Sequence, residues 1–350
     1  MALVAAANPF DKLPALAKVS LMAKISMTDL HVFPLALGGN VFGWTANQEE
    51  SFAVLDAYAA AGGNFIDTAE LYARWIPGGE HQSEIFIGGW LRERGLRDAL
   101  IISTKGGHPK LESMNVPRLS KREIESDLDS SLRRLGVDCV DIYWVHRDAP
   151  EMPVEEILLA LEVFRTAGKI KYSGLSNWHQ NRAEAARQAA LQLGIPGFIA
   201  SQNMWSLGLV NLGNADPTWA YIDADFVGWH IAHNFGAFPY LSQANGYFRR
   251  LEQNSLHQLA TDARVRTLFD HSENRKRFQR IQVLQKKSGL SVNQIVLGYL
   301  LNQRFQVIPL IGPKNIPDLE DSLGCAEVAL SPEDITFLEK GEARGIADNQ

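Results

Sequence analysis

The sequence predicts a single (β/α)8 barrel, an α/β fold in which eight parallel strands alternate with helices, and three observations support this. Short runs rich in β-branched and aromatic residues alternate with longer amphipathic stretches, which is typical of βα units. Most short runs are almost continuously apolar, as expected for strands covered on both faces. The chain has 350 residues without a Pro/Gly-rich linker, and a closed barrel uses roughly 250 residues as one unit. A doubly wound sheet is the alternative.

The predicted strands and two helices follow one another at regular intervals. Ser120 can cap a helix because Glu123, three residues later, completes a capping box. Another helix follows Pro153, begins with acidic residues and closes at Gly168, in agreement with the helix dipole. The eight strands are predicted at residues 33–39, 65–69, 99–105, 141–147, 172–177, 198–205, 237–243 and 306–312.

Three regions depart from this regular alternation. Residues 1–21 are Ala-rich without a clear period, and we interpret them as an N-terminal appendage to a barrel domain at residues 22–350. Residues 207–234 form a long aromatic segment before the seventh strand, and residues 248–271 separate that strand from its helix. Long loops are uncommon unless they are functional. On a barrel both would lie at the C-terminal face, where they could cover a substrate, and residues 207–234 could alternatively form a subunit contact.

Composition excludes several classes of partner. With 46% hydrophobic residues and a net charge of -6, the chain is typical of a soluble globular protein and lacks the basic surplus of nucleic-acid binders. Cys139 and Cys325 are too few for a disulfide framework and lack the spacing of a zinc site, so we expect no metal. No apolar run approaches the roughly 18 residues of a membrane span, and no export signal is evident. We therefore expect a cytoplasmic protein.

Four ionisable residues follow apolar runs where predicted strands end. They are Asp67, Tyr72 just beyond it, Lys105 and His146, from the second, third and fourth strands. In barrel enzymes the reacting groups lie at the carboxyl ends of strands, because those ends converge on one mouth. Each residue alone has an ordinary explanation, such as a helix cap or a solvated lysine. Because the four residues lie at or just after the ends of three successive strands, we expect them to form one cluster.

The four side chains together suit proton transfer to a carbonyl oxygen. A tyrosine has a pKa near 10, and an adjacent lysine ammonium should lower it and make Tyr72 a usable general acid or base. Asp67 can pair with Lys105 and orient it, and His146 can hydrogen-bond the oxygen that gains or loses the proton. Hydride would have to come from another source.

Several motifs in order resemble the aldo-keto reductases, in particular the longer bacterial and potassium-channel β-subunit-like branch. The stretch "GGNFIDTAELYA" resembles the family signature, with Asp and Tyr five residues apart. It is followed by "STKGG", "WVHR", "GLSNW", "SQNMWSL", "YLSQANGYF" and "IPLIGPKNIPDLEDSL". The opening "ISMTDLHVFPLALGG" is similar to the family's N-terminal β-hairpin and first strand. The resemblance extends from about Lys24 to Glu339.

The resemblance implies an oxidoreductase that interconverts an aldehyde or ketone and an alcohol, with hydride from a nicotinamide dinucleotide and a proton from Tyr72. The implied catalytic tetrad is Asp67, Tyr72, Lys105 and His146. Two alternatives remain open. One branch of the family contains cofactor-binding regulatory subunits with little or no turnover. A barrel hydrolase that uses Asp67 and His146 on a metal is less favoured, since no second ligand cluster supports it.

The resemblance also implies a set of cofactor contacts. Tyr240 would stack under the nicotinamide and expose the opposite ring face to Tyr72. Gly312 is expected to begin a helix N-terminus that attracts anions, and Lys314 adds a positive charge, so we expect NADP(H). NAD(H) is the alternative, because Asp318 would repel a 2′-phosphate and could bind a free 2′-hydroxyl. The implied contacts are Gly39, Asn40, Val41, Asp67, Ser176, Asn177, Gln202, Tyr240, Leu241, Ser242, Ala244, Asn245, Gly246, Ile311, Gly312, Lys314, Asp318, Asp321 and Ser322.

The substrate walls are expected to be largely aromatic. Their members would be Val41, Phe42, Trp44, Trp75, His108 and Trp205. This lining favours a bulky or ring-containing substrate, such as a sugar or a polycyclic alcohol, although the same aromatics could equally serve packing. The protein could be a monomer or a homo-oligomer.

Overall fold

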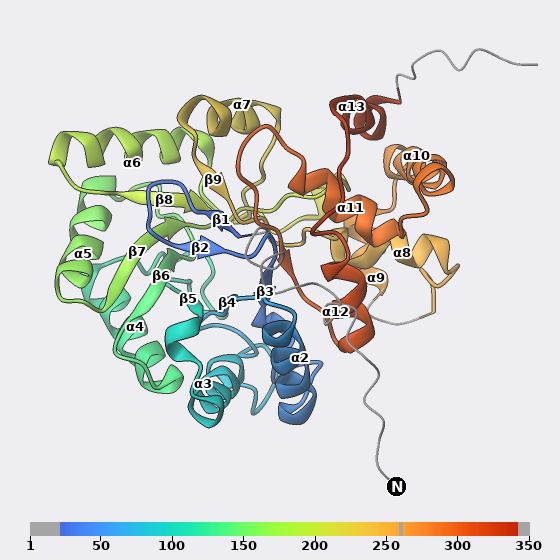
Figure 1. Cartoon of the computed structure of the whole chain (residues 1–350). Helices are drawn as coiled ribbons and strands as arrows, with labels where there is room; N and C mark the ends of the chain where they lie inside the picture. Colours follow the sequence, from blue (N-terminus) through green and yellow to red (C-terminus); the bar gives the residue numbers. More distant parts are fainter. Residues whose placement is uncertain (1–21, 259–261, 342–350) are drawn as a thin grey trace, which may run out of the picture.

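The computed structural model describes residues 22–258 and 262–341, and these form a (β/α)8 barrel (Figure 1). The prediction of eight parallel strands is confirmed. The strand order is β10-β3-β4-β5-β6-β7-β8-β9. The predicted appendage at residues 1–21 lies outside the described residues. The strands are β3 (Ala36–Gly38), β4 (Phe65–Asp67), β5 (Ile101–Gly106), β6 (Val140–Val145), β7 (Ile170–Leu175), β8 (Phe198–Ser201), β9 (Gly236–Ala237) and β10 (Leu310–Ile311).

The barrel closes between its last two strands and is filled by side chains. A parallel bridge joins Ala237 to Val307, and the amide of Ile308 donates to the carbonyl of Ala237 over 2.8 Å. Inside, the ring of Phe238 lies 5.2 Å from that of Phe65 and 5.3 Å from that of Trp144. The interior is therefore a packed core, and chemistry has to take place at an end of the barrel.

The predicted N-terminal hairpin is present and covers one end of the barrel. It consists of β1 (Ala23–Lys24) and β2 (His31–Val32), which are antiparallel. Gln306, just before β10, accepts a hydrogen bond from the Ser26 amide (3.1 Å) and donates one to the Lys24 carbonyl (2.8 Å). The hairpin's Ile25, Leu30 and Val32 join the core inside the barrel. This end is closed by packing, which points to the carboxyl ends of the strands as the place for a site.

Helices surround the strands (Figure 1). The capping box of Ser120 and Glu123 is confirmed at the start of α4, and α5 begins directly after Pro153 as predicted. The helices are α2 (Gln48–Ala60), α3 (Gln82–Arg94), α4 (Lys121–Leu135), α5 (Val154–Thr166), α6 (Gln180–Leu193), α7 (Ala224–His233), α8 (Tyr247–Glu252), α9 (Asp262–Phe269), α10 (Ser272–Ser288), α11 (Val292–Leu301), α12 (Ile316–Leu323) and α13 (Pro332–Lys340).

The two long segments are not simple loops, which corrects the sequence analysis. Residues 207–234 contain α7, whose first turn is capped by the Asp223 carboxylate accepting from the Phe226 amide (2.9 Å). Residues 248–271 contain most of α8 and all of α9. These helices are short and their aromatic residues obscure any period, so the sequence pattern did not reveal them.

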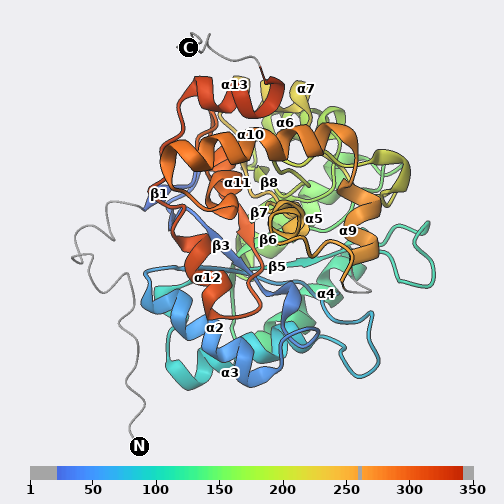
Figure 2. The same cartoon turned by 90° about the vertical axis from the view of Figure 1, so that its right-hand side faces the viewer.

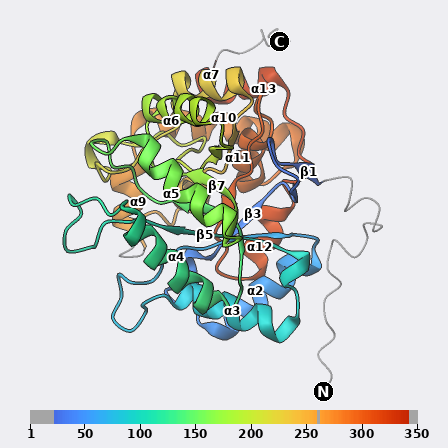
Figure 3. The ribbon, with the colours of Figure 1, turned by 90° about the vertical axis from the view of Figure 1, so that its left-hand side faces the viewer.

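The loops that follow β4 and β5 project from one side of the barrel, on which α9 also lies (Figures 2 and 3). This is the side of the carboxyl ends of the strands, because all eight run parallel. None of the described helices is long and apolar enough to cross a membrane. The described residues also contain no group of three or more His, Cys, Asp or Glu side chains placed to hold a metal ion.

Candidate active site

The centre of the site is a lysine ammonium with all three protons engaged. Lys105, near the end of β5, donates to Asp67 Oδ2 (2.5 Å), to the Thr68 carbonyl (2.7 Å) and to the Tyr72 hydroxyl (2.8 Å). β4 and β5 are paired neighbours in the barrel, and this pairing brings Asp67 next to Lys105 although the two residues are 38 positions apart in the sequence. The lysine is therefore held at one orientation beneath Tyr72.

Asp67 is fully buried, and both of its oxygens have donors. Besides the lysine on Oδ2, Ser103 Oγ (2.6 Å) and Gln202 Nε2 (3.1 Å) donate to Oδ1. A buried ion pair persists only when its remaining hydrogen-bonding capacity is satisfied, and here it is. Burial lowers the pKa of Lys105, but Asp67 and Tyr72 raise it more, so the net pKa lies above its usual value. The amine stays charged.

The Tyr72 hydroxyl is under opposing influences. Burial raises its pKa, whereas Lys105 lowers it by charge and by hydrogen bonding; the net pKa lies above the usual value of 10. The predicted lowering of this pKa by Lys105 is thus present, but desolvation, which the sequence analysis did not weigh, exceeds the effect of the ammonium. Tyr72 stands as a neutral phenol, the form that can donate a proton.

Two neutral histidines lie beside this phenol. The ring centroid of His146 is 6.2 Å from that of Tyr72 and 4.9 Å from that of His108, edge to face in both cases. The pKa of His146 lies well below its usual range, chiefly because the ring is buried and also because His108 and Arg147 are nearby. Burial likewise lowers the pKa of His108 to about 4. Both imidazoles are therefore uncharged at neutral pH, and His146 can donate one hydrogen bond without adding positive charge.

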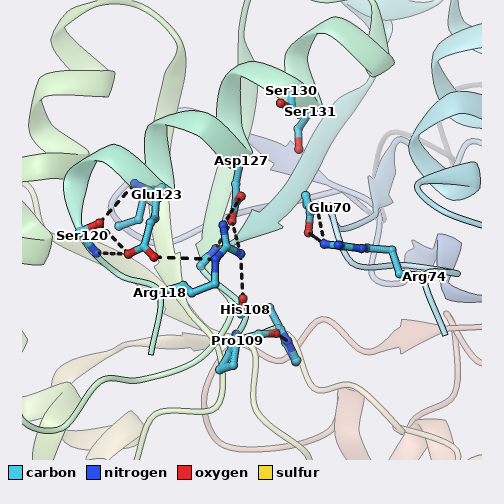
Figure 4. Close-up of polar contacts among 12 residues, drawn as sticks. Glu70, Arg74, His108, Pro109, Arg118, Ser120, Glu123, Asp127, Ser130 and Ser131 are labelled. Carbon is cyan, nitrogen blue, oxygen red and sulfur yellow. Dashed lines mark hydrogen bonds and ion pairs between the residues drawn. The ribbon is translucent and has the colours of Figure 1, made fainter. Parts of the chain in front are cut away.

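A clamp behind the loop after β5 holds His108 in place (Figure 4). Arg118 donates to the His108 carbonyl (3.0 Å) and to Asp127 Oδ1 (2.8 Å), while the Gly107 amide donates to Asp127 Oδ2 (2.9 Å). The sequence analysis missed this clamp. A signal was present, since Asp127 interrupts the buried stripe of α4 between Ile124 and Leu128. A carboxylate at a barrel-facing position needs a partner.

The glycines of "KGG" have separate physical roles. Gly106 faces the Tyr143 hydroxyl so closely that an added Cβ would lie 1.9 Å from it. Gly107 has a φ of 75°, which side chains rarely adopt. Together they allow β5 to turn sharply after Lys105 and deliver His108 to the His146 ring.

The ends of β7 and β8 join the tetrad through polar contacts. Gln202 donates to Asp67, as described above, and Ser176 Oγ donates to the Gln202 carbonyl (2.8 Å). Tyr240 donates its hydroxyl proton to Asn177 Oδ1 (2.6 Å), which fixes the plane of the aromatic ring. Asn203, which the sequence analysis did not single out, accepts from the Asn177 amide (2.7 Å) and holds that turn. The structure thus brings the residues predicted to bind a carboxamide to the tetrad.

The segment after Tyr240 has an unusual backbone. Leu241, Ala244, Asn245 and Gly246 all have φ between 48° and 75°. Non-glycine residues with positive φ are costly and concentrate at ligand-binding turns, where successive amides can form an anion-binding concavity. The hydroxyl of Ser242, one of the implied cofactor contacts, donates its proton to the Leu310 carbonyl (2.5 Å). Any phosphate contact here would have to come from backbone amides or Asn245.

The predicted adenosine end differs from expectation in two ways. The helix begins at Ile316 rather than at Gly312, because Asn315 caps it by accepting from the Asp318 amide (2.9 Å). Asp318 also accepts from Arg249 (2.5 Å), a residue that the sequence analysis missed. Its carboxylate is therefore paired, and the argument that Asp318 repels a 2′-phosphate loses its premise.

The other predicted cofactor residues lie around these two ends. Asp321 accepts from Ser291 (2.7 Å), and Ser322 is buried between the Asp318 carbonyl and Asn293. Gly39, Asn40 and Val41 form a short turn after β3. An added Cβ on Gly312 would lie 3.2 Å from Asn40 Oδ1, so this turn and the end of β10 are adjacent. Ile311 is the last residue of β10, and Lys314 is exposed.

The predicted substrate walls differ in their exposure. The rings of Trp44 and Trp75 are 43% and 39% exposed and meet edge to face at 5.4 Å, and the Trp75 ring lies 6.2 Å from that of Tyr72. The ring of Trp205 is instead buried and stacks on Phe305 (5.8 Å), so contact of Trp205 with a substrate stays a prediction. Phe42 is likewise fully buried, and Val41 is nearly so. Hydrophobicity alone did not separate core aromatics from rim aromatics.

A (β/α)8 barrel with this cluster of polar groups at its mouth suits the oxidoreduction of carbonyl and alcohol groups. The chain belongs to the aldo/keto reductase family, whose model matches residues 34–342. This family uses nicotinamide cofactors.

Named relatives are fungal. AAD14 of Saccharomyces cerevisiae, named as an aryl-alcohol dehydrogenase, is 29% identical over 89% of this chain and 83% of its own. Norsolorinic acid reductase B of Aspergillus parasiticus is 26% identical over 89% of this chain and 81% of its own. An aryl-alcohol dehydrogenase [NADP(+)] of Phanerodontia chrysosporium is 26% identical over 88% of this chain and 82% of its own.

Proposed function

We propose that this protein is an NADP(H)-dependent reductase of aromatic aldehydes or ketones that also runs in the alcohol-oxidising direction. The observation that carries the proposal is the phenol of Tyr72, held at 2.8 Å by an ammonium that Asp67 keeps charged, with a neutral His146 beside it. Such a set can give a proton to one oxygen and stabilise the phenolate that remains. The names of the fungal relatives support the aromatic substrate class and NADP.

The chain's residues suit the cofactor. The turn from Leu241 to Gly246, in which four residues have positive φ, offers a pyrophosphate those backbone amides that do not donate within the turn, and the Tyr240 ring, oriented by Asn177, offers a stacking surface. Ser176, Asn177 and Gln202 lie together next to the tetrad, where a carboxamide would be held. When bound, the nicotinamide supplies or accepts the hydride at the carbonyl carbon.

The residues of the tetrad would have distinct roles. Tyr72 donates its proton to the carbonyl oxygen as the carbon is reduced. Lys105 lies 2.8 Å from the same hydroxyl and stabilises the phenolate that forms, while Asp67 keeps the ammonium oriented. His146, uncharged, hydrogen-bonds the carbonyl oxygen and orients it without competing as an acid. In alcohol oxidation the same groups act in reverse order.

The direct test is a screen of carbonyl compounds with the purified full-length protein. We expect turnover of benzaldehyde and 2-naphthaldehyde with NADPH, and a lower KM for benzaldehyde than for cyclohexanecarbaldehyde, because Trp44 and Trp75 present aromatic edges near Tyr72. Cofactor oxidation at 340 nm measures turnover. Binding of NADPH without turnover of any aldehyde, ketone or alcohol would instead favour a regulatory subunit.

Cofactor choice can be tested at the Arg249–Asp318 pair. Asp318 on α12 holds the guanidinium of Arg249, so Arg249→Gln should weaken NADPH binding about fivefold, the upper range for an exposed ion pair, with less effect on NADH. Asp318→Asn should also weaken NADPH binding, by a smaller factor, because it removes the carboxylate that positions Arg249. Fluorescence titration gives the dissociation constants, and Arg92→Gln on the exposed face of α3 is the control. Equal losses for both cofactors would refute a role at the 2′-phosphate.

A further inference from the structure

Arg147 lies next to His146 of the tetrad and has no role in the proposed mechanism. It directly follows His146 at the end of β6 and is only 8% exposed. Its Nη1 donates to the His146 carbonyl (3.0 Å) and its Nε donates to Thr218 Oγ1 (3.2 Å). Both acceptors are neutral oxygens. The guanidinium is thus positioned by hydrogen bonds that leave its charge uncompensated.

Two other partly buried arginines show the usual arrangement, in which a carboxylate compensates the guanidinium. Arg118 pairs with Asp127 at 2.8 Å and Arg134 with Glu84 at 2.6 Å. Within the described residues, no Asp or Glu oxygen lies within 4.0 Å of Arg147. Arg277 on α10 is similar in this respect, but the charges that act on it are those of Glu273 and Glu339 rather than the tetrad. A buried cation without a partner is costly to maintain, which makes a functional role the natural explanation for Arg147.

The nearest carboxylate reaches Arg147 only through a hydroxyl. Thr218 Oγ1 donates to Asp216 Oδ1 (2.7 Å) and accepts from Arg147, so Asp216 is one side chain removed. Burial lowers the pKa of Arg147 below its usual value, and the charges of Tyr240, Asp216 and Tyr72 offset this lowering only in part. A guanidinium remains protonated at any ordinary pH. The uncompensated charge therefore persists in the working protein.

Arg147 also lies near the proton donor and near the stacking ring. It directly follows His146, whose ring centroid is 6.2 Å from that of Tyr72. It donates to Thr218, and the next residue, Trp219, meets the Tyr240 ring edge to face at 6.2 Å. Nη2 donates to none of the atoms in the described part of the chain. Arginine presents a planar fork that matches a carboxylate. One edge of the guanidinium thus remains for a ligand at the position where a substrate would approach Tyr72.

We propose that Arg147 binds a carboxylate of the substrate, so that the preferred substrates are aromatic aldehydes or ketones that carry a carboxylate group. The inference rests on the proposed function and names the substrate class of the same site. A monoanion suits the site better than a phosphate, because one arginine faces it and Asp216 opposes further negative charge. Trp44 and Trp75 would contact the ring of such a substrate.

The experiment compares matched acids and esters. Probes are 3- and 4-carboxybenzaldehyde and their methyl esters, which differ in charge but retain the aldehyde. For at least one pair, the wild type should prefer the acid in kcat/KM, and Arg147→Gln should reduce that acid-to-ester preference about tenfold or more, chiefly through KM. Arg147→Lys should restore part of the preference. Asp216→Asn should increase it, because the opposing carboxylate is gone.

Binding provides a readout independent of turnover. Calorimetric titration with 4-(hydroxymethyl)benzoate and its methyl ester should show a loss of affinity in Arg147→Gln for the acid that exceeds the loss for the ester. Equal kcat/KM for acid and ester in the wild type would overturn the proposal, as would a variant that loses both probes equally. Weakened NADPH binding with an unaltered preference would assign Arg147 to the cofactor instead. Turnover of the esters tests the proposed reductase function by itself. Failure of that function can therefore be distinguished from failure of the proposed carboxylate binding.

Discussion

Tyr72→Phe should reduce kcat for carbonyl reduction by about 10²- to 10⁴-fold, the usual contribution of a positioned general acid. The substitution removes one oxygen, the acceptor of a Lys105 proton at 2.8 Å, and retains the ring near Trp75. No other phenol in the described structure shares that lysine. Steady-state rates with NADPH and benzaldehyde measure the effect, and cofactor fluorescence separates loss of chemistry from loss of binding.

A matched control is available at the opposite end of the barrel. Tyr172 donates its hydroxyl proton to Asp29 beside the N-terminal hairpin (2.8 Å). Tyr172→Phe removes the same atom far from the tetrad and should retain most of the turnover. If Tyr72→Phe retained wild-type kcat, the proton would have to come from another group, and the assignment of Tyr72 would be wrong.

Lys105→Met should destabilise the fold by about 3–5 kcal/mol, since it leaves the fully buried Asp67 carboxylate without its counter-ion. Ser103 and Gln202 would still donate to Oδ1, but neither carries a charge. The free energy of unfolding from urea titration at pH 7 measures this loss. The exposed Lys110, in the loop after β5, serves as the control in Lys110→Met.

A second variant distinguishes charge from packing. Asp67→Asn combined with Lys105→Met removes both charges but retains an acceptor for Ser103 and Gln202. This double variant should recover at least half of the lost stability, because no buried ion is left unpaired. A double variant as unstable as Lys105→Met alone would show that the lost packing of the lysine chain, rather than the unpaired carboxylate, dominates.

Sequence order predicted the tetrad because of how a barrel is built. Apolar runs placed the strand ends, and parallel strands bring their carboxyl ends to one mouth, so Asp67, Lys105 and His146 could be grouped without knowing any distance. The same reasoning could not place side chains that reach the site from outside the strands. Arg118 and Arg249 act through loops and helices, and sequence spacing says nothing about such contacts.

The aromatic residues also show what the sequence could not predict, which is the burial of individual side chains. Trp75 lies shortly after one predicted strand and Trp205 ends another, yet Trp75 is exposed near Tyr72 and Trp205 is stacked on Phe305. Likewise, the pKa of Tyr72 depends on the balance between burial and Lys105, and the sequence reveals only the second. Desolvation is set by every neighbour at once, so only the folded chain determines it.

By itself, the sequence of this protein determined the eight-stranded barrel, the capping of α4 and the grouping of four catalytic candidates, since these depend on local periodicity and strand order. Tertiary structure alone decided that Asp318 is paired with Arg249 and that Arg147 is buried without a carboxylate. The physical reason is that pairing and burial depend on atoms from distant parts of the chain, and the spacing of residues in the sequence gives no information about which of these atoms meet.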